Sequence, residues 1–496
     1  MIQHILNNLT EFLGNPTDLQ VHFLPTAEEK DQQAALIYLS SITDESKINE
    51  LFIRPVIDEL LSKDHTPPDL VKIFIQQKFP MNGSMIEKKV SVIAQQLFEG
   101  KCIFLAKDLT DVISVDTAQW NNRAVTAPET EHSLIGPRDA FVEDLNVNLS
   151  MIRRRIRHQD LQVEQFTMGT KSQTKVILVY MKQLVNKQVL EQMQQRIQNI
   201  EMDVLVDTTQ LGHLILDKSN RFNPFPLFQT TERPDKTVAA MMEGRVLLLA
   251  DTTPTCAIFP STVSALYQTT DDYFFPSVSG TFIRLVRYVG MLTTLLLPGL
   301  YVAFTSVNSD ALRIQFMLAV AASREGLPYP AYIEVLIMIT LLELINEATV
   351  RLPKVIGGTA TIVGGLIIGS SAAQSHLVSN IMIVVTGTVA IGSYTVANYM
   401  IGIAWRMCSY GLMLLAIPWG VDGMATGAAL ILLYLCHIKS MGIPYLSPLS
   451  TFQLKELFRD ALIRLPAAMN PFRPSVYSKS AEGSRRVRIR EGEDSL

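Results

Sequence analysis

The chain has 496 residues, of which 48% are hydrophobic and 18% are charged, and its mean hydropathy is +0.21. It is too apolar for an ordinary soluble protein and too charged for a bundle of membrane helices alone, so the composition predicts a hybrid of the two. A net charge of −4 and a pI near 6.1 argue against nucleic acid as a partner.

The first half of the chain contains a repeat. Three segments recur in the same order: LQVHF (from Leu19) as LQVEQF (from Leu161), LIYL (around Tyr38) as LVYM (around Tyr180), and EGKCIFLA (from Glu99) as EGRVLLLA (from Glu243). This order predicts two related α/β subdomains, residues 1–130 and 161–275. Within the first, we expect residues 47–79 to be helical with an interruption at residues 65–68, and residues 102–106 to form a hairpin with residues 112–116.

A charged segment, residues 131–160, connects the two subdomains. HSLIGPRDAFVEDLNVNLSMIRRRIRH, residues 132–158, has the pattern of one helix, with Pro137 in its first turn, acidic residues near its start and arginines at its end. The apolar residues lie on one face: Phe141, Leu145, Leu149, Ile152 and Ile156.

The arginine run has two open interpretations. It is either a solvated helix end or a contact with a membrane surface, the other lobe or a neighbouring subunit. We take as candidate subunit contacts Arg138, Glu143, Arg153, Arg154 and Arg155.

Residues 282–440 have the pattern of an all-α, multi-pass transmembrane domain. The predicted spans are 288–306, 331–347, 355–371, 377–397 and 405–437, the last divided in two near Pro418, and 308–324 is predicted to be an interfacial or re-entrant helix. Arg284 and Arg287 place the leading edge in the cytoplasm by the positive-inside tendency. Residues 441–496 are predicted to be a basic cytoplasmic tail, which requires an even number of crossings.

Acidic residues in the predicted span 331–347 are candidates for an ion pathway, because charge at membrane depth is costly. Glu343, Asn346 and Glu347 share one face, and Glu334 lies on the opposite face. Glu347 also precedes Arg351 by four residues, the favourable order for a helix salt bridge. A pairing role and a pathway role therefore both remain open.

Small residues at successive steps of four follow in the next predicted span: Gly357, Thr361, Gly365 and Gly369. This ridge is typical of close helix packing. In a ring of identical subunits it could instead line a narrow pore.

Cysteine and histidine spacing gives no indication of a metal site, a disulfide framework or an active site. The four cysteines have no CxxC spacing and the eight histidines no HExxH pair. We therefore expect no enzyme activity and no cofactor or metal. No secretory signal is evident at the N-terminus, so we expect the first half to be cytoplasmic.

The segment GPRDAFVEDLNVNLSMIRRRI closely resembles the signature of the A subunit of GerA-type spore germinant receptors. Residues 222–260 and 281–353 resemble later blocks of the same family. The sequence departs from the family pattern at Ile135, where an arginine is usual, and at Asp139 and Ala140, where Glu and Gly are usual.

This resemblance implies a subunit of a nutrient receptor in the spore inner membrane, acting with a transporter-like B subunit and a lipoprotein C subunit. It implies a homo-oligomeric, pentamer-like ring embedded in lipid, which opens to cations when the receptor binds nutrient. The alternative is a non-conducting scaffold or signal relay of the same receptor. A substrate transporter is disfavoured, because the membrane half shows no matched inverted repeats.

Overall fold

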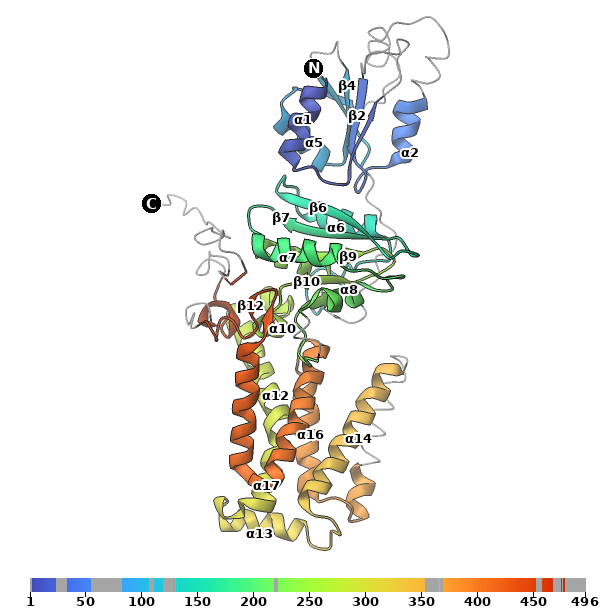
Figure 1. The fold of residues 1–496 in the computed structure, drawn as a ribbon. Coiled ribbons are helices and arrows are strands. Elements are labelled where there is room, and N and C mark those ends of the chain that lie inside the picture. Colours follow the sequence, from blue (N-terminus) through green and yellow to red (C-terminus); the bar gives the residue numbers. More distant parts are fainter. Residues whose placement is uncertain are drawn as a thin grey trace, which may run out of the picture. The chain divides into compact units, whose positions relative to one another are not determined.

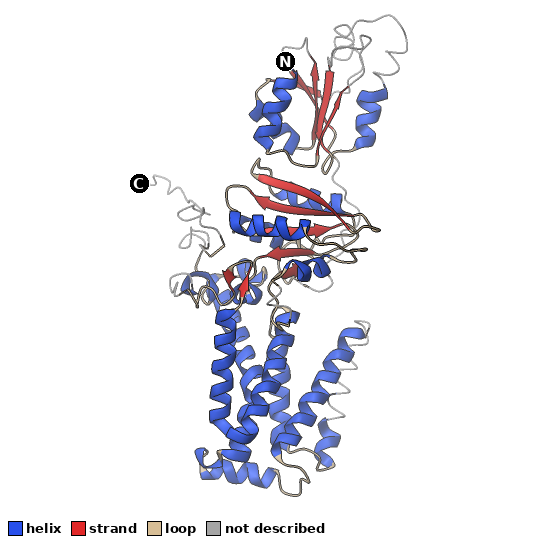
Figure 2. Cartoon of the chain, in the orientation of Figure 1, coloured by secondary structure: helices blue, strands red, loops and turns tan. Residues whose placement is uncertain are grey.

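The computed structural model describes residues 2–23, 34–54, 83–106, 111–118, 128, 131, 133–217, 222–352, 365, 369–451, 457–466, 474 and 476–477. The chain forms two compact units. The α/β unit comprises residues 1–217, 228–260 and 471–496, and the helical unit comprises residues 218–227 and 261–470. Figure 2 shows that long strands occur in the first and long helices in the second.

The first lobe of the α/β unit is a five-stranded antiparallel sheet with helices. Its elements are α1 (Ile2–Leu13), β1 (Leu19–Phe23), β2 (Ala34–Leu39), α2 (Glu45–Ile48), β3 (Gly83–Ile86), α5 (Val90–Phe98), β4 (Lys101–Ala106) and β5 (Val112–Asp116). The strand order is β1-β2-β4-β5-β3. Apolar residues of α1 and α5, which lie on one face of this sheet (Figure 1), form the core with β2 and β4.

The second lobe repeats this arrangement. Its elements are α6 (Leu145–Arg155), β6 (Leu161–Met168), β7 (Thr174–Met181), α7 (Lys187–Gln198), α8 (Thr208–Ile215), β8 (Gln229–Thr231), α9 (Pro234–Met242), β9 (Val246–Ala250) and β10 (Cys256–Phe259). The strand order β6-β7-β9-β10-β8 matches that of the first lobe strand for strand. The predicted repeat is therefore confirmed.

Two local predictions concern the first lobe, a hairpin and a helical stretch. Strands β4 and β5 pair antiparallel, which confirms the predicted hairpin. The predicted helix from residue 47 is helical as far as Arg54, and residues 55–79 lie outside the described part of the chain.

The predicted charged helix at 132–158 was wrong in its extent, because α6 begins only at Leu145. Asp144 ends the preceding non-helical segment, since its side chain caps the helix by accepting from the backbone N–H of Asn146 at 2.8 Å. Buried Asn148 fixes that segment further. Its Oδ1 accepts from the N–H of Val142 at 2.8 Å and its Nδ2 donates to the Val142 carbonyl at 2.5 Å.

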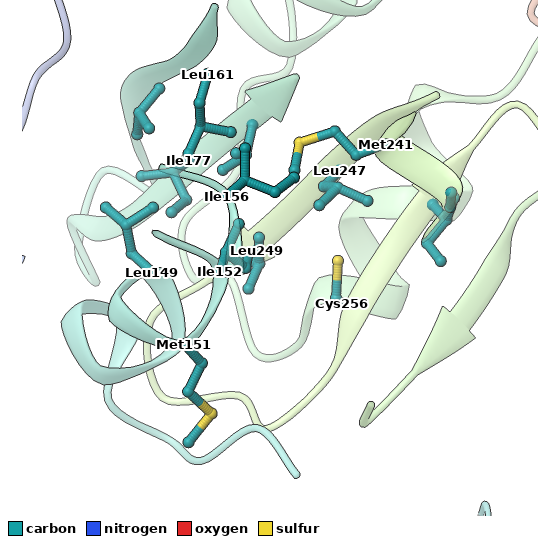
Figure 3. Close-up of a cluster of buried hydrophobic side chains, with 14 of the residues drawn as sticks. Leu149, Met151, Ile152, Ile156, Leu161, Ile177, Met241, Leu247, Leu249 and Cys256 are labelled. Carbon is teal, nitrogen blue, oxygen red and sulfur yellow. The ribbon is translucent and has the colours of Figure 1, made fainter. Parts of the chain in front are cut away.

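The predicted apolar face of this segment is confirmed, because all five of its residues are buried in the core of the second lobe. Figure 3 shows Leu149, Ile152 and Ile156 clustered with Ile177 and Leu249 of the sheet. The stripe therefore predicted the buried side chains correctly although the helix is shorter than expected.

The helical unit contains α10 (Val263–Tyr267), α11 (Asp271–Phe274), α12 (Ser277–Val302), α13 (Ile314–Ser323), α14 (Ala331–Arg351), α16 (Asn380–Tyr394), α17 (Tyr399–His437), β11 (Lys439–Ser440) and β12 (Ile443–Pro444). Two of the described helices, Ser277–Val307 and Tyr399–His437, are long and apolar enough to cross a membrane. α16 has only 15 residues, fewer than the roughly 20 that span a bilayer core. Most of the predicted span 355–371 lies outside the described residues, so the multi-pass arrangement stays a prediction.

Helix α17 is a hairpin of two helical halves. The backbone at Gly420 has φ 57° and ψ −133°, which breaks the helix two residues after Pro418. The Asn308 side chain caps the second half by accepting from the N–H of Val421 at 2.9 Å. A methyl group on Gly427 would meet a methyl carbon of Leu412 at 2.6 Å, so the halves lie against each other. The predicted division of this span is confirmed.

Candidate functional site

The candidate site is the set of carboxylates on α14 and their partners in the helical unit. All three carboxylates of α14 face an arginine, and the three arginines come from different places in the chain. Arg324 follows α13, Arg406 lies in α17, and Arg351 lies in α14 itself.

Glu334 lies in the first turn of α14 and is 1% exposed. It accepts hydrogen bonds at 2.6 Å from both the backbone N–H and the hydroxyl of Ser379. Arg324 Nε lies 3.4 Å from its other oxygen, and the Tyr301 hydroxyl lies 3.5 Å from that same oxygen. Because Ser379 also caps α16, this carboxylate joins the starts of α14 and α16. Glu334 is thus enclosed within one chain in this structure.

Glu343 forms an ion pair with Arg406 of α17, in which Arg406 Nε lies 3.1 Å and 3.0 Å from the two carboxylate oxygens. The arginine side chain is 12% exposed and the glutamate side chain 40% exposed. One turn further along α14, buried Asn346 accepts a hydrogen bond from the Tyr394 hydroxyl at 2.6 Å. Arg406 was not among the residues predicted for this site, and the structure places it against Glu343.

Glu347 pairs with Arg351 at 2.6 Å, which confirms the pairing predicted from their spacing. Both side chains are largely exposed, at 55% and 78%. The predicted polar face therefore divides into one inter-helix ion pair, one inter-helix hydrogen bond and one exposed pair within α14.

The predicted small-residue ridge is only partly visible, since Gly357 and Thr361 lie outside the described residues. In the described part of the chain, a methyl group placed on Gly365 or Gly369 would meet no atom within 4 Å. By contrast, a methyl group on Gly392 of α16 would lie 2.8 Å from the carbonyl oxygen of Gly290 in α12. The close helix contact of this unit was therefore missed from the sequence, because its glycines are far apart in the chain.

The start of α12 carries a second buried cluster of charges. Asp272 of α11 and Arg284 of α12 are both 0% exposed, and Arg284 Nε lies 3.4 Å from Asp272 Oδ2. Arg287 Nη1 donates to the same oxygen at 2.8 Å. Arg284 also donates to the backbone carbonyl of Asp460. The two arginines predicted as leading-edge charges are thus paired within the protein.

A family model described as Bacillus/Clostridium GerA spore germination protein matches residues 7–476. The chain belongs to this family. Spore germination protein A1 of Bacillus subtilis (strain 168) is 32% identical over 435 residues, covering 88% of each chain. Spore germination protein GerLA of Bacillus cereus is 30% identical over 490 residues, covering 98% of this chain and 97% of the relative.

Two further similarities were found. An uncharacterized membrane protein, YfkQ of Bacillus subtilis (strain 168), is 31% identical over 463 residues, covering 93% of this chain and 89% of the relative. The N-terminal domain of the A subunit of the Bacillus megaterium spore germinant receptor GerK3 matches with a TM-score of 0.36 and 25% identity. That match covers 51% of this chain and 92% of the solved chain.

The signature arginines of this GerA-family chain occupy different environments. Arg153 is 3% exposed and forms an ion pair with Asp18 of the first lobe. Arg155 pairs with Asp139 of its own lobe. Arg154, by contrast, is exposed, as are two other candidate subunit contacts, Arg138 and Glu143. Arg153 therefore joins the two lobes, which is one of the arrangements expected for the arginine run.

Proposed function

We propose that this GerA-family chain is the A-type subunit of a nutrient-responsive spore germinant receptor, and that a ring of such subunits conducts cations when the receptor binds nutrient. The match to the family over residues 7–476 carries this proposal, because it includes both the α/β unit and the helical unit. The channel would lie in the spore inner membrane, with the α/β unit in the cytoplasm.

The helical unit supports a membrane role with an ion pathway. Two described helices have the length and apolar composition of membrane spans, and α14 brings three carboxylates into the same unit. Ionisable residues among membrane helices are costly and commonly mark ion pathways. Glu343 is the best placed of the three, because it is 40% exposed and contacts Arg406 of another helix, whereas Glu334 is buried and Glu347 pairs within α14.

Assembly with other chains is part of the proposal. The expected partners are a transporter-like B subunit, a lipoprotein C subunit, further copies of this chain, and membrane lipid. Among the described residues, a methyl group on Gly365 or Gly369 would meet no atom within 4 Å, which leaves room for a neighbouring helix or for a pathway.

The second candidate is a non-conducting relay that passes nutrient occupancy from the partner subunits to another protein. The ion pairs favour this alternative, since an arginine lies within 3.4 Å of each carboxylate of α14 and offsets its charge. A pathway for cations needs at least one carboxylate to be available.

Cation flux into lipid vesicles that contain the chain with its partner subunits tests the proposal. We expect flux on nutrient addition, reduced flux with Glu343→Gln, and reduced or blocked flux with Gly365→Leu. Glu325→Gln removes the same charge from an exposed position after α13 and should leave flux unchanged. Absence of flux from the complete receptor would favour the relay, and flux unaffected by either change would move the pathway away from these residues.

A further inference from the structure

The ion pair between Glu343 and Arg406 differs from the other two pairs of α14. Glu347 and Arg351 lie in one helix and are largely exposed, so their contact fixes no other element. Glu334 is almost completely buried and accepts two short hydrogen bonds from Ser379, so removal of Arg324 would still leave it with donors. Glu343, by contrast, forms its ion pair with Arg406, which lies 63 residues away in another helix.

Arg406 is more deeply buried than its partner Glu343. Arg406 is 12% exposed, and its guanidinium group also lies 6.0 Å from the ring of Tyr399 in the same helix. Glu343 remains 40% exposed. Within the single chain the carboxylate is therefore the more accessible partner, and the adjacent guanidinium charge repels a cation that approaches it.

We infer that Arg406 of α17 is a positioning residue with two effects. It holds the Glu343 side chain of α14 against α17, and it reduces the negative charge that α14 presents to cations. Release of Glu343 from Arg406 would leave this carboxylate without the arginine charge that now offsets it. The effect on ion flow rests on the proposed channel function, whereas the coupling of α14 to α17 does not.

The test compares variants of the complete receptor in vesicles under a potassium chloride gradient. Arg406→Gln should raise nutrient-independent flux several-fold and shift the reversal potential toward greater cation preference. Arg406→Lys should retain most of the wild-type behaviour, because it keeps the positive charge. The exchange of Glu343→Arg with Arg406→Glu should lower the leak again, since it restores an opposite-charge pair. Arg313→Gln, which removes a charge from an exposed position before α13, is the matched control.

The inference would be overturned if Arg406→Gln kept the wild-type reversal potential and the wild-type nutrient-independent flux. It would also be overturned if the charge-exchange variant showed as much nutrient-independent flux as Arg406→Gln. The thermal unfolding midpoint supplies a readout that is independent of conduction. If the pair couples α14 to α17, Glu343→Gln together with Arg406→Gln should lower the midpoint no more than the worse single change. Additive losses would overturn the coupling even if the receptor conducts. If the vesicles show no flux but the losses in the double variant are not additive, the channel function is overturned and the coupling of α14 to α17 stands.

Discussion

Arg153 of the family signature and Asp18 of the first lobe form a buried ion pair between residues 135 positions apart. Arg153 Nη2 lies 2.5 Å from Asp18 Oδ1, and the Ser41 hydroxyl donates to the other oxygen of Asp18 at 2.6 Å. Nearby, the Gln162 side chain donates to the Leu13 carbonyl at 2.9 Å. The signature arginine is therefore one of several polar contacts that fix the turn before β1 onto the second lobe.

Replacement of Arg153 by alanine should weaken this contact between the two lobes. The change leaves the Asp18 carboxylate buried without its charge partner, which typically costs about 3–5 kcal/mol. We expect faster backbone hydrogen exchange in β1 and β6 of the full-length protein and lower accumulation of the receptor.

Lys171→Ala is the control for this prediction, because it breaks the Lys171–Asp203 pair, whose side chains are 73% and 68% exposed. Such a surface pair contributes only about 0–1 kcal/mol. Equal exchange rates in the two variants would show that the buried pair does not hold the lobes together.

The repeat of the α/β unit was predictable because its strands keep their apolar character and their order in both copies. The start of α6 was predicted too early, since the charge pattern could not show that Asp144 caps the helix and Asn148 holds the preceding segment. Spacing also predicted the pair Glu347–Arg351, because four residues bring side chains together on any helix. Arg406 was missed because its contact depends on how two helices pack.

The contact between α12 and α16 should not tolerate a side chain at Gly392. A methyl group there would lie 2.8 Å from the carbonyl oxygen of Gly290 and 3.0 Å from the Thr294 hydroxyl, so the helices would have to separate. Overpacking of this kind costs about 1–3 kcal/mol. Gly392→Ala should therefore lower the thermal unfolding midpoint of the detergent-solubilised protein.

Gly387 of the same helix supplies the control, since a methyl group there would meet no atom within 4 Å. Gly387→Ala should leave the midpoint unchanged or raise it, because alanine favours helix by about 1 kcal/mol over glycine. If the midpoint fell equally in both variants, the loss could not be assigned to the contact between Gly392 and Gly290.

Alkaline pH should destabilise the first lobe through Tyr38. Burial, with smaller contributions from Glu45 and Cys102, raises the pKa of Tyr38 from 10.0 to about 12. Between these two values the unfolded chain has lost the phenolic proton while the folded chain keeps it, so stability falls as pH rises from 10 to 12. Tyr38→Phe should show a weaker loss over this range when unfolding is followed by hydrogen exchange in β2. Parallel pH dependences of the two proteins would exclude this cause.

The cluster at the start of α12 should depend on Asp272, because this carboxylate is the shared partner of Arg284 and Arg287. Asp272→Asn would remove the common counter-charge of two guanidinium groups, 0% and 12% exposed, and leave Arg284 with the Asp460 carboxylate at 3.5 Å, so the cost should not exceed the roughly 3–5 kcal/mol typical of a broken buried pair. We expect lower accumulation in membranes and a lower unfolding midpoint. Asp310→Asn, at an exposed site in the same unit, removes an equal charge and should change neither. If Asp272→Asn instead accumulates like wild type, then the carbonyl of Asp460 and the other acceptors around the arginines suffice to hold α12 in place.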